Sequence, residues 1–575
     1  MKILGLNLGH NATACLVEDG KVTGCVSEER FSRIKNHYGY PTKAVEHLLN
    51  GILPDYIVVD DDYNPNADPY FGKRFQESYT KKSFKNKLLA SIACKFPKLF
   101  ALYYKRKLKK IEKKRKWNIH DIKVYISNKL DFPHDKILTM NHHLAHALSS
   151  CFFDMKKKLI FTLDGEGSGL CATLNLWNGK EMKLLSKSSK MASLGYLYGI
   201  TTIFMGMKPL EHEFKVMGLA PYSKQDKVNE VYNKLKGLIW INKNLEFESK
   251  FSMPFFDDYI KRELKFVRFD TMAGAVQKLV EELTCKWVDE AIKRYGVSDI
   301  ALSGGVFMNV KANQKIHELR AVKSLFVVPS CGDEANAIGA AFYGYKSYCE
   351  IYNLEVKPQM ITDLYLGPDY DEEYLKILIE SLSKTKYKAT KFRNINKVIA
   401  KLLARGEIVA RCSGRSEWGA RALGNRSILA DAASPGVIQK LNETIKNRDW
   451  FMPFTPSILT EDIRRYAINP KKMFAPYMNI TFDSTDEAKE EIPAAMHPYD
   501  KTIRPQMVTK EHNPDYHEII TEFKKLTGHS GILNTSFNLH GEPNVLTPED
   551  ALHTVENSSL KYLVMGNYLF RKEGQ

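Results

Sequence analysis

The stretch MKILGLNLGHNATACLVEDGKV, residues 1–22, decides the fold class of this chain of 575 residues. It consists of an apolar strand, a bend that contains Gly9 and His10, a second apolar strand and the turn Asp19-Gly20. Two apolar runs joined in this way predict a β-structure, and an Asp-Gly pair is typical of a hairpin turn. The histidine at the bend raises the question of what chemistry it serves.

The same pattern recurs in LIFTLDGEGSGLCATLNLWNGK, residues 159–180, where the Gly-rich bend contains Asp164. Two copies predict a duplicated α/β architecture whose halves face one another. A third element, DIALSGGVFMN, is a buried strand that runs into Gly304 and Gly305, where missing Cβ atoms let backbone approach a ligand. In order and spacing these elements resemble the actin-like ATPases, whose hairpins hold phosphates and whose Gly-Gly turn adjoins adenosine.

The chain is long enough for two or three domains. A helical run at 336–353 is followed by a charged, proline-containing linker, and we expect a domain boundary near residue 357. Residues 1–357 form the predicted actin-like domain. Residues 358–575 alternate helix-like and strand-like runs, which predicts a second α/β domain.

The nine cysteines form no C-x-x-C pair, which favours reduced, buried thiols over disulfides or a zinc cluster. The sequence contains no signal-peptide core and no run of about 20 apolar residues. We therefore expect a cytoplasmic protein without a transmembrane segment.

The net charge of +17 is concentrated in one segment, since residues 73–117 hold 17 Lys and Arg against two Glu. The run KRKLKKIEKKRKW within it is helical in pattern. Two interpretations stay open, a solvated helical excursion and a surface for an anionic polymer, membrane or nucleic acid.

A candidate metal site begins in NHHLAHALSS, where Asn141 is a predicted N-cap. His142 and His146 lie four residues apart and share one helical face, whereas His143 points about 100° away.

Two aspartates strengthen this site, because Asp164 and Asp333 both lie at predicted strand ends that face the cleft of a duplicated domain. Imidazole and carboxylate ligands suit Fe(II), Mn(II) or Zn(II). The alternative is that Asp333 caps a helix and Asp164 stabilises a turn.

Nine motifs, in order over nearly the whole chain, resemble the O-carbamoyltransferases of antibiotic and nodulation-factor biosynthesis: NHHLAH, LDGEGSG, EHEFKVMGLAPY, SGGVFMN, CGDEANAIGAA, EWGARALGNRSILAD, MPFTPSIL, TIRPQMV and LNTSFNLHGEPNV. The resemblance implies an actin-like domain similar to the universal tRNA-threonylcarbamoylation protein (Kae1-like), followed by a YrdC-like domain. It implies that the second domain forms carbamoyl adenylate from carbamoyl phosphate and ATP, releasing pyrophosphate, and that the first passes the carbamoyl group to a hydroxyl.

In the C-terminal half, Lys446-x-Arg448 and Ser536-x-Asn538 look like the K-x-R and S-x-N signatures of YrdC domains. Arginines neutralise clustered phosphates bidentately, and Ser and Asn can hold the neutral carbamoyl group. The residues expected to bind carbamoyl phosphate and ATP are Arg421, Arg426, Lys446, Arg448, Arg504, Ser536 and Asn538. Ion pairs with Glu417, Asp431 and Asp449 are the competing interpretation for some of them. Met452 stands where many relatives have an arginine, which leaves the charge of this pocket open.

In the N-terminal half the resemblance places His10 beside the acceptor hydroxyl, where a near-neutral imidazole suits a general base. It implies a nucleotide or carbamoyl-adenylate site at Lys35, Gly304, Gly305 and Asn309, with a surface lysine as the alternative for Lys35. The expected cofactors are ATP, Mg for the nucleotide, and a divalent metal, Fe(II) before Mn(II) or Zn(II).

The expected partners are carbamoyl phosphate and a hydroxyl-bearing, sugar-like small molecule or natural product, with no nucleic acid. Oligomeric state stays open, a homodimer among the options. Two rival functions remain, a threonylcarbamoyl-type tRNA-modifying enzyme and an actin-like ATPase with a regulatory C-terminal domain.

Overall fold

The computed structural model describes residues 1–61, 119–250, 256–382, 387–434 and 436–572. The chain divides into two compact units. The N-terminal unit comprises Met1–Glu28 and Asn36–Ile361, and the C-terminal unit comprises Glu29–Lys35 and Thr362–Gln575. The basic segment 73–117 lies outside the described residues. Among the described helices, none combines the length and apolar character needed to cross a membrane.

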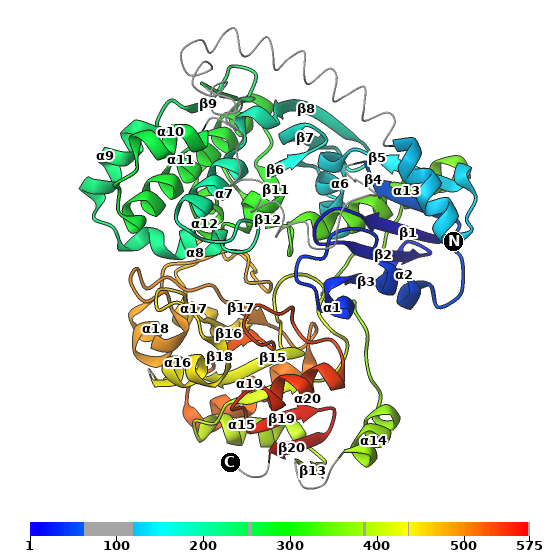
Figure 1. Ribbon diagram of the computed structural model, residues 1–575, viewed down its shortest axis with the longest axis vertical. Helices are drawn as coiled ribbons and strands as arrows, with labels where there is room; N and C mark the ends of the chain where they lie inside the picture. The colour runs from blue at the N-terminus through cyan, green and yellow to red at the C-terminus, as the bar shows by residue number, and fades with distance from the viewer. Residues whose placement is uncertain (62–118, 251–255, 383–386, 435, 573–575) are drawn as a thin grey trace. The chain divides into compact units, whose positions relative to one another are not determined.

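The first sheet of the N-terminal unit has the strand order β3-β2-β1-β4-β5 (Figure 1). β1, β2 and β3 are antiparallel neighbours, whereas β4 and β5 add parallel to β1. Its strands are β1 Lys2–Asn7, β2 Thr13–Glu18, β3 Lys21–Ser27, β4 Tyr56–Asp60 and β5 Ile137–Met140. The predicted hairpin is confirmed, and its turn has positive φ at both Asp19 and Gly20.

The second sheet repeats this arrangement, with the order β8-β7-β6-β11-β12. β6, β7 and β8 are again antiparallel, and β11 and β12 are again parallel. Its strands are β6 Lys158–Gly167, β7 Leu170–Trp177, β8 Met182–Ser189, β11 Asp299–Ser303 and β12 Ser324–Val327. The matching strand orders confirm the predicted duplicated, actin-like α/β architecture.

Helices and a short ribbon complete the N-terminal unit. These are α2 Thr42–Leu49, α6 His142–Ser149, α7 Leu194–Phe204, α8 Glu213–Leu219, α9 Gln225–Leu235, α10 Phe256–Glu263, α11 Phe269–Tyr295, α12 Val310–Glu318, α13 Asn336–Ile351, and the strands β9 Ile239–Ile241 and β10 Phe247–Ser249. The longest, α11, is capped by Gly296 in the left-handed conformation.

Helix α13 packs unusually closely on both the first sheet and α6. A Cβ on Gly5 of β1 would lie 2.1 Å from the Ala337 carbonyl oxygen, and one on Gly339 would lie 1.9 Å from the Ala145 carbonyl oxygen. Both distances are impossible for real atoms, so the contacts require glycine. They place the N-terminal end of α13 beside the ends of β4 and α6.

The C-terminal unit is built on one mixed sheet of eight strands, in the order β13-β20-β19-β14-β15-β18-β16-β17. Its strands are β13 Tyr387–Lys391, β14 Val409–Cys412, β15 Arg426–Asp431, β16 Thr455–Leu459, β17 Gln506–Val508, β18 Ile532–Ser536, β19 Tyr562–Met565 and β20 Tyr568–Lys572. The predicted second α/β domain is thus confirmed as an α/β unit.

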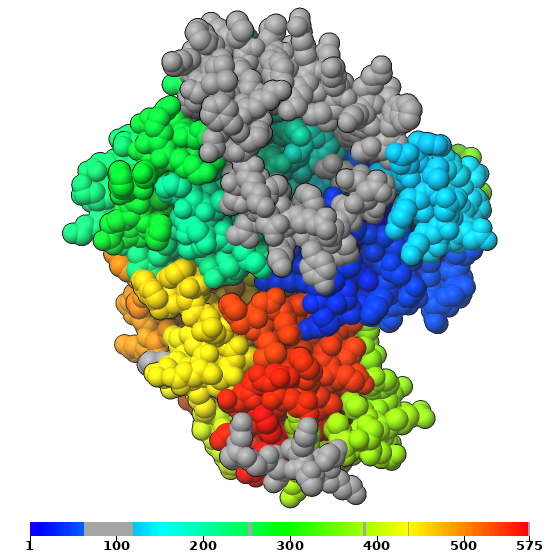
Figure 2. Space-filling model, in the orientation of Figure 1, coloured from blue at the N-terminus to red at the C-terminus, as the bar shows by residue number. Residues whose placement is uncertain are grey.

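Buried side chains of α15 and α19, such as Ile399, Leu403 and Phe523, pack on sheet residues Leu429 and Val564. The helices of this unit are α1 Glu29–Ser32, α14 Glu372–Ser381, α15 Ile395–Ala404, α16 Gly436–Leu441, α17 Ile463–Tyr466, α18 Asp486–Glu491, α19 Pro514–Thr527 and α20 Pro548–Glu556. In Figure 2 the yellow segment that holds α16 adjoins the red segment that holds α20, although the two are far apart in sequence.

We expect Gly339→Ala to destabilise the protein, because the added methyl collides with backbone that cannot move independently of α6. Overpacking of this kind costs about 1–3 kcal/mol. Thermal unfolding followed by circular dichroism measures the effect. Gly199→Ala in α7 is the matched control, since its Cβ would meet only the Glu213 carboxylate at 3.8 Å. Equal melting temperatures for the two variants would contradict the close-packing argument.

Candidate functional site

The centre of the N-terminal unit is formed by two histidines of α6. Asn141 caps this helix as predicted, since its side chain accepts hydrogen bonds from the amides of His143 and Leu144. The Nε2 atoms of His142 and His146 lie 3.1 Å apart, and both side chains are almost fully buried. The i, i+4 spacing has therefore brought the two imidazoles together as the sequence predicted.

Two aspartates complete the cluster. Asp164 Oδ2 lies 3.6 Å from His142 Nε2 and 4.0 Å from His146 Nε2. Asp333 Oδ1 lies 3.5 Å from each of these nitrogens. All four ligand atoms lie within 4.8 Å of one another, and all four residues are buried.

This donor set fits a divalent cation. Ligands bound at about 2.0–2.2 Å around one cation lie roughly 3.0–3.5 Å from each other, close to the separations observed. Asp333 Oδ1 is buried and makes no hydrogen bond within the described residues. A cation would give this oxygen a partner and would relieve the contact between the two Nε2 atoms. Mixed nitrogen and oxygen donors suit Fe(II), Mn(II) or Zn(II).

Neighbouring groups orient the cluster. Asp60, at the end of β4, lies 3.1 Å from His142 Nδ1 through its Oδ2 atom, and the Asn336 amide donates to the same oxygen at 3.3 Å. With its Nδ1–H donated to Asp60, His142 would offer Nε2 to a cation bound at the centre. Gly305 N donates to Asp164 Oδ1 at 2.9 Å, which leaves Oδ2 directed at the histidines.

Asp60 and Asn336 were not predicted from the sequence. Asp60 ends an ordinary apolar strand, and Asn336 lies in a helix start whose motif drew attention to Asp333 instead. The sequence offered one indication for Asp60: it follows an apolar strand, and ligands bind at the carboxyl ends of parallel strands.

The histidines and aspartates of the cluster shift the pKa values of one another. Burial by itself would lower the pKa of His142, but Asp333, Asp164 and Asp60 outweigh it and raise this pKa well above its ordinary value. Burial would raise the pKa of Asp333, but His10, His142 and His146 hold it well below its usual range. The carboxylates of Asp164 and Asp333, whose pKa values both lie below the ordinary value, are therefore ionised at neutral pH.

His10 lies at the edge of this cluster. Its Nε2 is 3.1 Å from Asp333 Oδ2, and 33% of its side chain is exposed. Burial lowers the pKa of His10, but Asp333, Asp164 and Glu334 together raise it above its ordinary value. The bend is shaped by Asn7, whose side chain donates to the carbonyls of His10 and Asn11 and accepts from Gly9 N.

His143 is directed away from the centre, as predicted. Its Nδ1 lies 2.8 Å from Thr162 Oγ1, and burial, followed by the charges of His142 and His146, lowers its pKa to about 3. His143 is therefore a neutral, structural histidine.

The residues predicted to bind a nucleotide in the N-terminal domain do not all belong to the same unit. Gly304 has a φ of 103° and abuts β6, where a Cβ would lie 2.4 Å from the Leu163 carbonyl oxygen. Asn309 caps α12 and exchanges two amide hydrogen bonds with Gln277, at 2.8 and 3.0 Å. Lys35 belongs to the C-terminal unit rather than to the N-terminal one. A nucleotide site at these residues stays a prediction.

The C-terminal unit brings Lys446 together with Ser536 and Asn538. Lys446 Nζ donates to Ser536 O at 2.5 Å and to Asn538 Oδ1 at 2.8 Å, and Ser536 Oγ donates to Asn538 Oδ1 at 2.6 Å. Lys446 ends a π-helical turn, Asn442–Lys446, a local irregularity that is frequent at functional sites.

The charge of Arg448 acts on this lysine, and Arg421 and Arg504 act on Arg448 or on each other. Arg448 donates to Thr535 Oγ1 at 2.8 Å and stacks on Phe454, 4.7 Å from the ring centroid. Burial and then Arg421 lower the pKa of Arg448 to about 10. Burial, followed by Arg421 and Arg448, lowers the pKa of Arg504 well below its ordinary value, and Arg504 Nε makes no hydrogen bond within the described residues.

We call Lys446, Arg421, Arg448 and Arg504 the cation cluster. Burial lowers the pKa of Lys446 well below its ordinary value, and the positive charges of Arg448 and Lys35 lower it further. Lys446 is buried, and the three arginines are half-buried. Cations that are partly withdrawn from water and repel one another are stabilised when an anion binds among them. The cluster is therefore suited to a polyanionic ligand.

Arg426 is placed differently from the other predicted residues. Its guanidinium is buried and donates to backbone carbonyls, among them Leu546 O and Gly414 O at 2.9 Å each. Through these hydrogen bonds Arg426, the first residue of β15, holds the backbone at Gly414 and Leu546. Its role as a phosphate ligand stays a prediction. Met452 is half-buried and ends the turn Asp449–Met452. It adds no charge to the predicted phosphate pocket.

Family models match both units of the chain. "Carbamoyltransferase N-terminus" matches residues 2–342, and "Carbamoyltransferase C-terminus" matches residues 400–572. The chain belongs to the carbamoyltransferase family. The resemblance drawn from the nine motifs is thus confirmed, and the protein is a carbamoyltransferase enzyme.

Relatives cover almost the whole length of this carbamoyltransferase. An uncharacterized protein of Methanocaldococcus jannaschii is 30% identical over 581 residues, which is 99% of each chain. Nodulation protein NolNO of Sinorhizobium fredii is 28% identical over 591 residues, 98% of this chain and 79% of the relative. Among solved structures, T. kodakarensis HypF is 15% identical, covers 63% of this chain and 49% of its own, and has a TM-score of 0.34.

We expect Gly167→Ala to disrupt the histidine–aspartate cluster, because the added Cβ would lie 2.0 Å from the His142 ring. The ring must rotate away, so affinity for Zn(II) or Fe(II) should fall by about 10-fold or more, a factor of ten being 1.4 kcal/mol. Competition with a chromophoric chelator measures it. Gly165→Ala in the same bend is the control, since no atom lies within 4 Å of its Cβ. Unchanged affinity in Gly167→Ala would refute the assignment of His142 as a ligand.

We expect Asp60→Asn to weaken metal binding by about 10–100-fold, the usual effect of removing a carboxylate that orients a ligating histidine. The same chelator competition measures this loss. Asp61→Asn is the matched control, because it removes the neighbouring carboxylate, which accepts a hydrogen bond from Ser168 Oγ. Equal losses in the two variants would show that charge near β4, and not the orientation of His142, is what matters.

Proposed function

We propose that this carbamoyltransferase is an ATP-dependent O-carbamoyltransferase that modifies a hydroxyl of a sugar-like small molecule or natural product. The observation that carries the proposal is the pairing of two complementary sites in one chain. The N-terminal unit holds an imidazole–carboxylate centre with His10 at its edge. The C-terminal unit holds the buried Lys446 and three half-buried arginines, with Ser536 and Asn538 as neutral hydrogen-bonding groups on the lysine.

The cation cluster supports the formation of carbamoyl adenylate. Carbamoyl phosphate gives up its phosphate to water, and the resulting carbamate oxygen attacks the α-phosphorus of ATP. The bond between the α- and β-phosphates breaks, so that carbamoyl adenylate, phosphate and pyrophosphate are the products. Arg448 and Arg504 would neutralise the phosphates, with Mg on the nucleotide, while Ser536 and Asn538 would hold the carbamoyl amide.

The N-terminal centre supports the transfer step. The acceptor oxygen attacks the carbamoyl carbon, its proton leaves to a base, and the bond from that carbon to the AMP oxygen breaks. His10 suits the base because it is partly exposed and is oriented by Asp333. A divalent cation held by His142, His146, Asp164 and Asp333 would act as a Lewis acid toward a carbonyl or phosphate oxygen.

The products distinguish this function from its rivals. Incubation with carbamoyl phosphate, ATP and a panel of aminoglycosides and oligosaccharides should yield AMP, pyrophosphate and an acceptor heavier by one carbamoyl group. An actin-like ATPase would yield ADP and phosphate, and a tRNA-modifying enzyme would instead give modified adenosine with bulk tRNA, threonine, bicarbonate and ATP. Either of these outcomes would replace the proposal.

We expect His10→Asn to slow carbamoyl transfer by about 10²–10⁴-fold, the usual contribution of a positioned general base. Adenylate formation should continue, because Lys446, Arg448 and Arg504 are unchanged. The assay follows AMP and carbamoylated product together. The control is Lys446→Gln, which should abolish both AMP and product. A His10→Asn variant with wild-type product yield per AMP would show that another group accepts the proton.

A further inference from the structure

A short segment of the N-terminal sequence is part of the C-terminal unit. Residues Glu29–Lys35, which begin with the single-turn helix α1, group with Thr362–Gln575 rather than with the strands on either side of them in sequence. We call this segment the strap. Its two arginines contact two loops of the C-terminal unit, defined here as the 417–426 loop and the 536–544 loop.

Arg30 contacts the first of these loops. Its side chain is buried, and Nη2 donates to the Gly419 carbonyl at 2.6 Å. The rest of the 417–426 loop is gathered around Glu417, whose Oε1 accepts hydrogen bonds from the amides of Leu423, Asn425 and Arg426. Arg421 of the cation cluster lies between Gly419 and Leu423 in this loop, so Arg30 holds backbone next to a cluster residue.

Arg33 contacts the second loop. Its Nη1 donates to Asn544 O at 2.7 Å and its Nη2 donates to Pro543 O at 2.9 Å. Two carboxylates flank the same guanidinium, Glu542 and Asp550, each at 3.6 Å. A non-glycine residue with a positive φ, 59° at Arg33, persists only when surrounding contacts stabilise it.

The 536–544 loop is the loop that holds Lys446. Ser536 and Asn538 bind Lys446 Nζ, and Asn538 Nδ2 in turn donates to Glu542 O at 2.7 Å. Arg33 therefore acts on the same turn that positions the amide of Asn538. Arg30 and Arg33 lie three residues apart, so one short element holds both loops.

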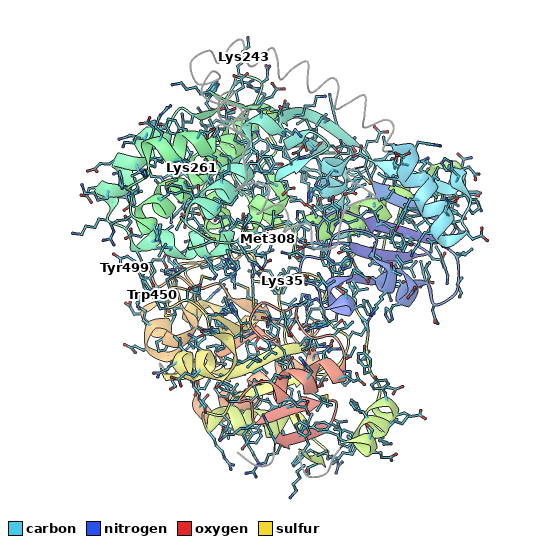
Figure 3. The ribbon with its side chains drawn as sticks, viewed as in Figure 1. Lys35, Lys243, Lys261, Met308, Trp450 and Tyr499 are labelled. Carbon is cyan, nitrogen blue, oxygen red and sulfur yellow. The ribbon has the colours of Figure 1, made fainter. Side chains whose placement is uncertain are left out.

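The strap ends at Lys35, labelled in Figure 3. The charge of Lys35 is one of the two cationic neighbours that, after burial, lower the pKa of Lys446.

We propose that the strap fastens the 417–426 and 536–544 loops through Arg30 and Arg33 and so orders the backbone that carries Arg421 and the turn that holds Lys446. Arg30 and Arg33 are then positioning residues. The inference deepens the proposed function and rests on it, since both loops belong to the site assigned to carbamoyl phosphate and ATP.

The experiment uses the full chain and two readouts that need no turnover. Hydrogen exchange measured by mass spectrometry reports the order of the two loops, and isothermal titration with inorganic pyrophosphate reports the anion site. Arg33→Ala should raise amide exchange in the 536–544 loop by about 10-fold, the factor that 1.4 kcal/mol of lost stabilisation gives, and should weaken pyrophosphate binding. Arg320→Ala, at an exposed arginine of the N-terminal unit, is the control for both readouts.

Exchange in Arg33→Ala equal to that in Arg320→Ala would overturn the fastening role. Pyrophosphate binding as tight in Arg33→Ala as in Arg320→Ala would overturn the role of the strap in ordering the anion site.

These outcomes separate the strap from the proposed function. A wild-type protein that binds pyrophosphate but releases none from ATP and carbamoyl phosphate would refute adenylate formation. The difference between Arg33→Ala and Arg320→Ala would still decide whether the strap orders an anion site.

Discussion

The close approach of α13 to β1 and α6 is the constraint on which the N-terminal site depends. Glycines at positions 5 and 339 allow backbone-to-backbone contact that any side chain would prevent. This contact sets the N-terminal end of α13 at the ends of β4 and α6, so Asp333, Asn336, His142 and Asp60 converge although they come from distant parts of the chain. Because a metal site needs its ligands held to within about 0.5 Å, the capacity of this cluster to hold a cation would depend on the packing of α13.

The Asp333 carboxylate contacts both the histidine pair of α6 and His10. One of its oxygens faces the two Nε2 atoms of α6, and the other faces His10. Because the same carboxylate is shared, the position of the imidazole at the hairpin bend depends on the position of the histidine–aspartate cluster. The histidine in the opening hairpin is therefore explained by its partner more than 300 residues away.

The candidate sites of the two units differ in the charge of the groups that line them. In the N-terminal unit, carboxylates surround imidazoles and keep the pKa of His142 high, an arrangement suited to a cation. In the C-terminal unit, half-buried guanidinium groups and the buried Lys446 ammonium repel one another and have lowered pKa values, an arrangement suited to phosphates. Both arrangements are costly without a ligand, and such cost is characteristic of binding sites.

Local patterns in the sequence were sufficient for much of this protein. The Asp19-Gly20 turn, the Asn141 cap and the i, i+4 spacing of His142 and His146 depend on neighbours within a few residues, and each has the geometry predicted. The duplicated hairpins indicated the duplicated sheets, and the motifs indicated the family. Contacts between distant segments could not be derived in this way. Only the tertiary structure showed that Asp60 orients His142, that Arg426 binds backbone carbonyls, and that residues 29–35 belong with the C-terminal unit. The physical reason is that a hydrogen bond or a glycine contact between distant residues is set by how whole elements pack, and packing leaves no period or spacing in the chain.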